Sequence, residues 1–155
     1  MPTATCACGA CHIVLDKFLG TAMCHCLTCR KYTSANYSLS AVTTADAFHL
    51  VKGSPKPHKQ FGDTGVPSTR YFCGECGSTL WIEHSPKPEL RIIKAGVVDG
   101  DGALDDLKPL FEQYVKRRPQ WLPAVEGAAQ FDEMRTVEYR DQHLAKALEA
   151  NGRKV

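Results

Sequence analysis

The sequence has no long apolar run and no large net charge. No apolar stretch in its 155 residues approaches the roughly 18 that suggest a membrane span, and Met1 to Thr5 lack the basic and apolar parts of a secretory signal. We therefore expect a cytoplasmic protein with no membrane partner. A formal net charge of +2 provides no strong field directed at nucleic acid, so we expect no nucleic-acid partner either.

The chain also lacks a Ser/Gly-rich linker, which argues against a division into several domains. With 43% hydrophobic residues, it is long enough to bury one core. We expect a single domain in which residues 1–135 form a zinc-binding β part and residues 136–155 a C-terminal helical extension.

Short stretches rich in β-branched and aromatic residues alternate with Gly, Pro and Asp, a pattern typical of strands. The expected strands are His12–Leu15, Tyr37–Val42, Phe48–Val51, Thr69–Phe72, Thr79–Glu83 and Leu90–Gly96. Between them, Phe61–Ser68 is predicted to be a turn-rich loop, because its glycines accommodate positive φ. The pattern therefore predicts a mainly β protein.

The last third of the chain changes in character. Pro109, Pro119 and Pro123 make a long regular element unlikely to form between them, and we expect this segment to wrap around the sheets. From about Val137 to Ala150 the residues favour a helix, with Asn151-Gly152 as its C-terminal cap. The sequence thus predicts one terminal helix, which packs on the domain, frays into solvent or contacts a second subunit.

The cysteines are confined to three clusters. The pattern C-x-C-x-x-C occurs at residues 6–11 and again at 24–29, and C-x-x-C-G occurs at 73–77, so these segments hold all eight cysteines. Thiolates one or two residues apart can converge on one tetrahedral Zn²⁺, whereas such close neighbours are poorly placed to form disulfides with each other. In a reducing compartment, clustered cysteines favour metal binding. We therefore expect a zinc protein.

Two of the clusters combine into a set of four thiolates. Cysteines two residues apart on an extended segment point the same way, and the C-x-x-C pair has the spacing of a zinc knuckle. The set is Cys6, Cys8, Cys73 and Cys76. Gly9 and Gly77 follow and permit tight turns whose N–H groups can donate to sulfur. A closed site of this kind has a structural role, the alternative being a redox pair.

Cys24, Cys26 and Cys29 remain, together with the odd thiol Cys11. If Cys11 completes this second set, both zinc sites are closed and structural. If Cys11 packs elsewhere, three thiolates leave one coordination position open, as catalysis requires. His25 lies between two candidate ligands and is expected to point away from the metal, as an outer residue or a surface residue.

The charge of a three-thiolate site limits its chemistry. Zn²⁺ with three thiolates carries one net negative charge, so it activates water less readily than a three-histidine site. Such a site suits a soft fourth ligand, and a substrate thiolate matches it.

The order of these motifs resembles the glutathione-dependent formaldehyde-activating enzyme (GFA) family, which also includes proteins similar to centromere protein V. The resemblance covers Thr5 to Trp121. It is carried by C-x-C-G at Cys6–Gly9, C-H-C-x-x-C at Cys24–Cys29, F-C-x-x-C-G at Phe72–Gly77, and by Arg30, Phe48, Gly53, Pro109 and Trp121. The segment Arg118–Leu122 looks like that of fungal members.

The resemblance implies an Mss4-like arrangement of antiparallel sheets. It also implies that Cys6, Cys8, Cys73 and Cys76 hold a structural zinc, and that Cys24, Cys26 and Cys29 hold a catalytic one. Members of this family are described as carbon-sulfur lyases that act on glutathione adducts, and some members act on other substrates or have no known reaction. Cys11 falls where many members carry a small apolar residue, which favours a buried thiol that binds no metal.

The leading hypothesis is a zinc-dependent carbon-sulfur lyase that acts on glutathione, or on a thiol adduct of an aldehyde or another electrophile, with the substrate sulfur at the open position. The residues available for proton transfer are His25, Tyr32, Glu83 and His84. Arg30, Lys31 and Arg70 are conceivable anchors for substrate carboxylates.

The alternative is a non-catalytic interaction module with two closed zinc sites. A methionine sulfoxide reductase is disfavoured because only Cys11 is spare. A homodimer is left open.

Overall fold

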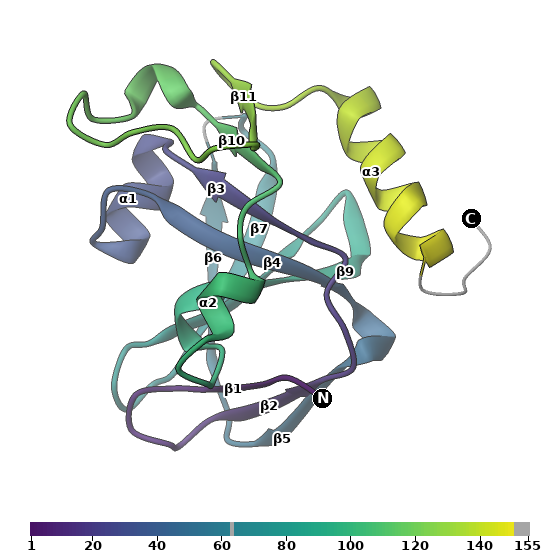
Figure 1. The fold of residues 1–155 in the computed structure, drawn as a ribbon. Coiled ribbons are helices and arrows are strands. Elements are labelled where there is room, and N and C mark those ends of the chain that lie inside the picture. Colours follow the sequence, from purple (N-terminus) through teal and green to yellow (C-terminus); the bar gives the residue numbers. More distant parts are fainter. Residues whose placement is uncertain (63, 151–155) are drawn as a thin grey trace.

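The computed structural model describes residues 1–62 and 64–150, and in this part of the chain the strands form two sheets (Figure 1). The smaller sheet has the order β1 (Thr3–Thr5), β2 (His12–Leu15), β5 (Phe48–Lys52). The larger sheet has the order β11 (Ala129–Phe131), β10 (Phe111–Gln113), β3 (Gly20–Cys24), β4 (Ser38–Thr44), β9 (Lys87–Lys94), β8 (Thr79–His84), β7 (Pro67–Phe72), β6 (Lys56–Phe61). The α-helices are α1 (Leu27–Thr33), α2 (Ala103–Asp106) and α3 (Val137–Ala150), and 3₁₀ turns occur at Ala45–Ala47, Ala95–Val97 and Val115–Arg117.

The fold class is confirmed: the described chain is mainly β, and it ends in a helix. Most neighbouring strands pair antiparallel, as expected. The exception is one edge of the larger sheet, where β10 pairs parallel with both β3 and β11. The sheet is therefore mixed, and this edge joins the late part of the chain to the strand that ends at Cys24.

Each of the six expected strands is present within a few residues of its predicted bounds. Strands β1, β3, β6, β10 and β11 were not expected. Three of these contain only three residues and carry little pattern. Strand β6 is polar and contains Pro57, which is tolerated because β6 is an edge strand. Phe61 and Pro67, predicted in a loop, end β6 and begin β7.

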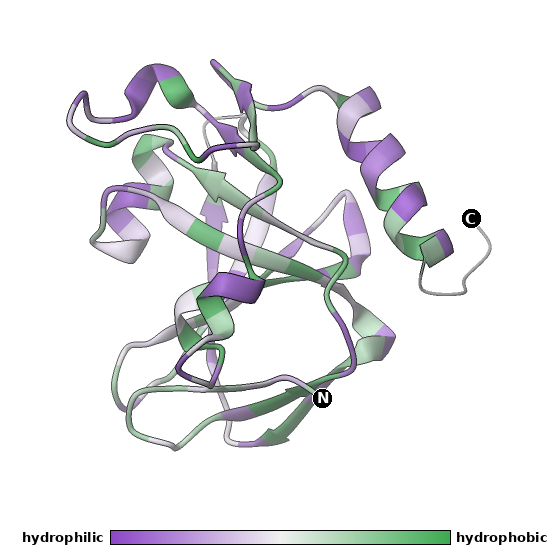
Figure 2. Ribbon diagram, in the orientation of Figure 1, coloured by the Kyte–Doolittle hydropathy of each residue, from purple (hydrophilic) through white to green (hydrophobic). Residues whose placement is uncertain are grey.

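The C-terminal helix α3 spans Val137–Ala150, the predicted range. The predicted cap at Asn151-Gly152 lies outside the described residues. Tyr139 attaches the helix to the sheet edge, with ring centroids 5.5 Å from Phe111 and 4.8 Å from Phe131. No residue of α3 is fully buried, and both hydrophilic and hydrophobic residues occur along the helix (Figure 2). The division into parts at residue 135 stays a prediction.

The main core lies between the two sheets. It is formed by Ala4, Cys6, Cys11, Ile13, Leu15, Cys73, Leu80, Trp81 and Ile93. Trp81 stacks on Tyr71 with centroids 4.4 Å apart. Gly53 passes this core closely, because a Cβ built there would lie 2.4 Å from the Ala10 carbonyl oxygen and 2.9 Å from the Cys11 sulfur, and its φ is +92°. Only glycine, which has no Cβ, tolerates both this close approach and the positive φ.

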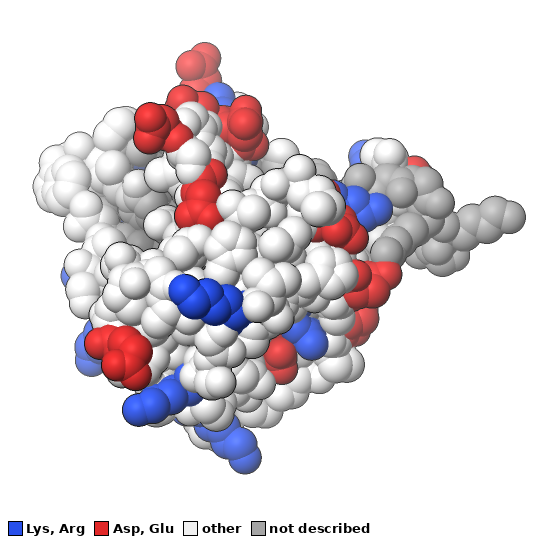
Figure 3. All heavy atoms as spheres, turned by 90° about the horizontal axis from the view of Figure 1, so that it is seen from below, with Lys and Arg blue, Asp and Glu red and all other residues white. Residues whose placement is uncertain are grey.

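Within residues 1–62 and 64–150, no helix combines the length and apolar character needed to cross a bilayer. The face shown in Figure 3 carries Lys/Arg and Asp/Glu groups of both signs, separated by uncharged surface. This distribution agrees with the small net charge of +2.

Candidate metal centres

Four cysteines meet at one end of the core between the sheets. Cys6 and Cys8 follow β1, and Cys73 and Cys76 lie in the turn between β7 and β8. Their four sulfurs lie within 4.8 Å of one another, with 3.6 Å between Cys6 and Cys8 and 3.8 Å between Cys8 and Cys73. Metal-sulfur bonds of about 2.3 Å in a tetrahedron give sulfur-sulfur edges of about 3.8 Å. The arrangement therefore fits a tetrahedral metal ion.

Two glycines shape the turns around these sulfurs. Gly9 has φ +73° and Gly77 has φ +75°, and the N–H groups of the two glycines donate to the carbonyls of Cys6 and Cys73. The N–H groups of Ala10, Cys11 and Ser78, just past the glycines, donate to sulfur, and the Cys8 N–H donates to the Cys76 sulfur. The positive φ thus directs the following N–H at a thiolate, as zinc knuckles require.

Three other cysteines form a second group at the end of β3 and the start of α1. The sulfurs of Cys24, Cys26 and Cys29 all lie within 4.8 Å of one another. Cys24 is the last residue of β3, and Cys26 is the N-cap of α1, with its sulfur accepting the Cys29 N–H at 3.2 Å. The strand end and the first helical turn therefore bring the three sulfurs together, and this group could also hold a metal ion.

Hydrogen bonding among the three thiols of the second group shifts their pKa values in opposite directions. Hydrogen bonds from Cys26 and Cys29 lower the pKa of Cys24 to about 3. The neighbouring Cys24 and Cys26 raise the pKa of Cys29 well above its ordinary value. A divalent cation would remove this conflict, because it favours the thiolate form of all its ligands.

Cys11 lies with the first group and not with the second. It is 3% exposed and packs in the core beside Cys6 and Cys73. Burial and the adjacent Cys73 raise the pKa of Cys11 to about 12. Among the described residues, the second group therefore contains three cysteines and no fourth.

His25 points away from the cysteines, as expected, but into the protein and not to the surface. Its side chain is fully buried, and its Nε2 lies 2.9 Å from Oε1 of Glu112, which is also fully buried. The parallel pairing of β3 with β10 places Glu112 beside this loop. His25 therefore lies behind the cysteine group and attaches the loop that carries the cysteines to β10.

Glu112 was missed from sequence, although it joins several segments. Its Oε2 accepts hydrogen bonds from the Val125 N–H at 2.8 Å, from Gln130 at 2.7 Å and from Arg118 at 3.3 Å. Burial raises the pKa of Glu112, but the bonds from His25, Val125 and Gln130 and the charge of Arg118 outweigh burial and lower it overall. A single Glu in a three-residue strand carries no motif, so only the fold identifies it.

We expect Glu112→Gln to destabilise the protein by about 3 kcal/mol, because it leaves buried donors without a charged acceptor. Since the folded state lowers the pKa of Glu112, its stabilising contribution is present above the ordinary carboxyl pKa. The contribution is lost as the pH falls through the lowered value. Denaturant unfolding of the wild type and of Glu112→Gln at several acidic pH values checks this. The difference between their free energies of unfolding should become smaller as the pH falls. Glu149→Gln, at an exposed position near the end of α3, is the control and should leave the free energy of unfolding unchanged across this pH range.

The outer face of the larger sheet, opposite the core, is basic next to the second cysteine group. Lys94 was also missed from sequence; it is 8% exposed, and its Nζ donates to the Ser38 and Ser40 hydroxyls at 2.6 and 3.1 Å. The Arg70 guanidinium lies 4.3 Å from the ring centroid of Tyr32 in α1. The Tyr32 hydroxyl lies 3.2 Å from Nε2 of His58.

The other predicted residues are more dispersed. Arg30 and Lys31 are exposed at the end of α1. Glu83 contacts Trp81 and Arg91, on the core side of the sheet. His84 ends β8, and burial followed by the charges of nearby arginines lowers its pKa. Of the predicted proton-transfer residues, the structure therefore places Tyr32 and the buried His25 on segments that carry the second group.

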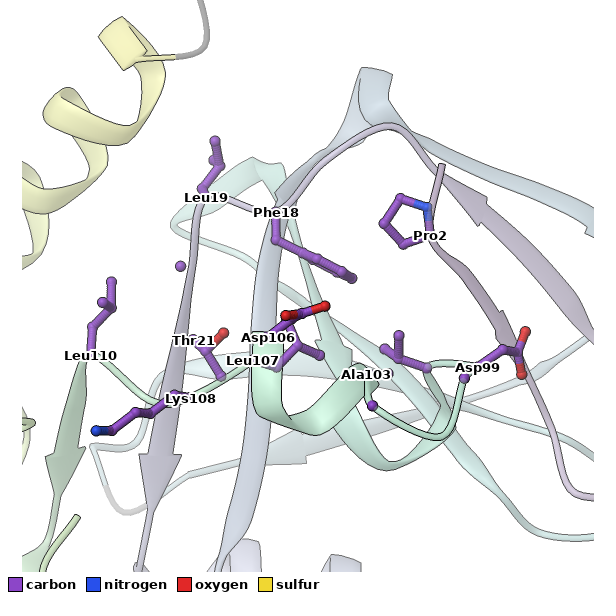
Figure 4. Close-up of a pocket in the computed structure, with 14 residues that line it drawn as sticks. Pro2, Phe18, Leu19, Thr21, Asp99, Ala103, Asp106, Leu107, Lys108 and Leu110 are labelled. Carbon is purple, nitrogen blue, oxygen red and sulfur yellow. The ribbon is translucent and has the colours of Figure 1, made fainter. Parts of the chain in front are cut away.

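A cavity of about 670 Å³ lies apart from both cysteine groups (Figure 4). It is formed by the N-terminal segment, the start of β3 and the region around α2, with Phe18, Asp106 and Leu107 among its lining residues. No described cysteine lines it.

A family model described as glutathione-dependent formaldehyde-activating enzyme matches residues 1–117. None of the curated proteins matches the chain. A crystal structure of a Rhodobacter sphaeroides protein shares the fold, with a TM-score of 0.54 and 21% identity over 69% of this chain and 96% of that one. The matched family region contains both cysteine groups, Lys94 and Glu112. On this match, the chain belongs to the glutathione-dependent formaldehyde-activating enzyme family.

Proposed function

We propose that the protein is a zinc-dependent carbon-sulfur lyase that acts on glutathione or on a glutathione-type thiol adduct of an aldehyde or another electrophile. The observation that carries the proposal is the unequal pair of cysteine groups. One has four sulfurs with tetrahedral spacing, and the other has three sulfurs with no fourth cysteine among the described residues. A site with three protein ligands keeps one position for a substrate.

The first group would hold a structural zinc through Cys6, Cys8, Cys73 and Cys76. It joins the turn after β1, which belongs to the smaller sheet, to the turn between β7 and β8 of the larger sheet. Its position at the end of the core supports a role in holding the two sheets together. Four thiolates leave no room for a substrate.

The second group would hold the catalytic zinc through Cys24, Cys26 and Cys29. When bound there, zinc would supply a Lewis-acid position that keeps the sulfur of a thiol in its thiolate form. The protein residues position this site: the Cys29 N–H donates to the Cys26 sulfur, and Glu112 holds His25 between the first two ligands. These contacts fix the loop before substrate arrives.

The reaction needs one proton transfer. When the C–S bond of a hydroxyalkyl thiol adduct breaks, its electron pair stays on sulfur, and the hydroxyl proton leaves as the carbonyl forms. Tyr32 is the candidate to relay this proton, because it follows Cys29 by three residues on α1 and its hydroxyl contacts Nε2 of His58. The Tyr32 oxygen would take the substrate proton while the phenolic proton passes to Nε2 of His58. The reverse direction would form the adduct through the same groups.

The interaction-module alternative has less support, because it requires Cys11 to close the second site. Cys11 packs beside Cys6 and Cys73 instead. A methionine sulfoxide reductase would need an accessible redox cysteine, and Cys11 is buried. The cytoplasmic location, the homodimer and the likeness to fungal and centromere protein V-like members stay predictions.

Replacement of the metal by Co²⁺ tests this proposal through its absorption spectrum. We expect two ions per chain and, on addition of glutathione, a change in the sulfur-to-cobalt bands that corresponds to one new thiolate ligand. S-hydroxymethylglutathione should be cleaved or formed by the zinc protein at a rate well above the buffer rate. Two bound ions with a spectrum that no thiol changes would instead favour the interaction module.

A further inference from the structure

A buried lysine lies beside the second cysteine group. Lys94 ends β9, where it is paired with Ser40 of β4, while Ser38 of the same strand is paired with Cys24 of β3. The hydrogen bonds from Lys94 to both serines show that these side chains share one face of the sheet. Ile93 lies in the core, so this is the opposite, outer face. A row of polar groups thus leads from Lys94 to Cys24.

The hydrogen-bond partners of Lys94 are neutral. Both are serine hydroxyls, and no described carboxylate forms an ion pair with its ammonium group. A buried ammonium is costly unless an opposite charge compensates it. The preceding Ile92-Ile93 and the following Ala95 would suit an apolar residue at this position. The lysine therefore needs an anion that the neighbouring secondary structure does not provide.

The anions in reach are the thiolates of the second group. Burial lowers the pKa of Lys94, and the thiolates of Cys29, Cys24 and Cys26 oppose this effect. Arg70, on the same face, adds a second positive charge close enough to lower the pKa of Lys94 further. This face therefore places two cations beside one set of thiolates.

We propose that Lys94 is the counter-ion of the three-cysteine site and makes its open position select an anionic fourth ligand over a neutral one. This inference rests on the proposed function, because it requires an open metal site. A divalent ion with three thiolates has one net negative charge, which Lys94 balances. A substrate thiolate then enters a neutral site, whereas without Lys94 it would meet like charge. Lys94 is a positioning residue that acts through the charge of the site.

The test compares an anionic with a neutral ligand in the Co²⁺ protein. Lys94→Met removes the charge and keeps a long side chain. We expect glutathione binding, followed by absorption, to weaken about 10- to 100-fold, while imidazole binding changes less than about twofold. Lys87→Met is the matched control on the same strand; Lys87 is partly exposed and should leave both affinities unchanged. If Lys94→Met does not fold, the same two binding measurements are made on Lys94→Gln.

An equal loss of glutathione and imidazole binding would show a merely structural role and overturn the inference while leaving the proposed function intact. Unchanged glutathione binding in Lys94→Met would also overturn it. If the wild-type protein with two bound ions takes up no thiol, the proposed function fails, and the counter-ion inference fails with it.

Discussion

Cys73→Ser is expected to prevent the chain from reaching its native fold. Cys73 is 1% exposed, and it belongs both to the core between the sheets and to the four-sulfur group. Binding of a structural zinc contributes roughly 10–16 kcal/mol in zinc-finger peptides at neutral pH. The whole stability of a domain is only about 5–15 kcal/mol. Loss of this site therefore removes most or all of the stability.

The measurement is metal content per chain after a mild chelator challenge, together with a thermal transition followed by circular dichroism. The Ser variant should lack the native transition. Cys11→Ser is the matched control, because Cys11 packs beside Cys73 but is not proposed as a ligand. It should retain two ions. Loss of one ion from Cys11→Ser, with a native fold, would contradict the assignment of the ligands.

Cys29→Ser is expected to abolish lyase activity and leave the fold in place. Cys29 lies in the first turn of α1, away from the core between the sheets, so its loss opens no large cavity there. Two remaining thiolates hold a divalent ion poorly. Lewis-acid stabilisation supplies several kcal/mol of the barrier reduction, so its loss should slow turnover by roughly a thousandfold.

The variant should bind one ion per chain and keep the thermal transition of the wild type within a few degrees. Leu27→Ala is the control in the same helical turn, since Leu27 is 47% exposed and offers no ligand. It should keep both ions and full activity. Normal activity in Cys29→Ser would refute the catalytic role of this group, whereas collapse of the fold would assign it a structural role.

Local patterns explain why several elements could be predicted. Strand β2 and helix α3 occur at the expected bounds, since alternation and helix-forming residues are visible within each segment. Strand β10 could not be predicted, because three residues carry no period and its partners, β3 and β11, are distant in sequence or separated by a long turn. Strand formation there depends on pairing that only the assembled sheet provides.

The surroundings of the sites were harder to foresee than the sites themselves. His25 was expected to point away from the metal, but its burial on Glu112 depends on the parallel pairing of β3 with β10. Lys94 lies sixty-five residues after Cys29 and directly follows the apolar pair Ile92-Ile93. Nothing in that interval of sequence connects them, and their proximity results from the β3-β4-β9 order of the sheet.

Cysteine spacing alone determined that the chain offers thiolate clusters suited to metal, because ligands one or two residues apart converge whatever the rest of the fold does. The tertiary structure decided where Cys11 belongs, since that depends on how the turn after β1 meets the turn between β7 and β8. It also decided which charges surround the three-cysteine group. Short-range geometry is encoded locally, whereas burial and electrostatics arise only when distant segments pack together.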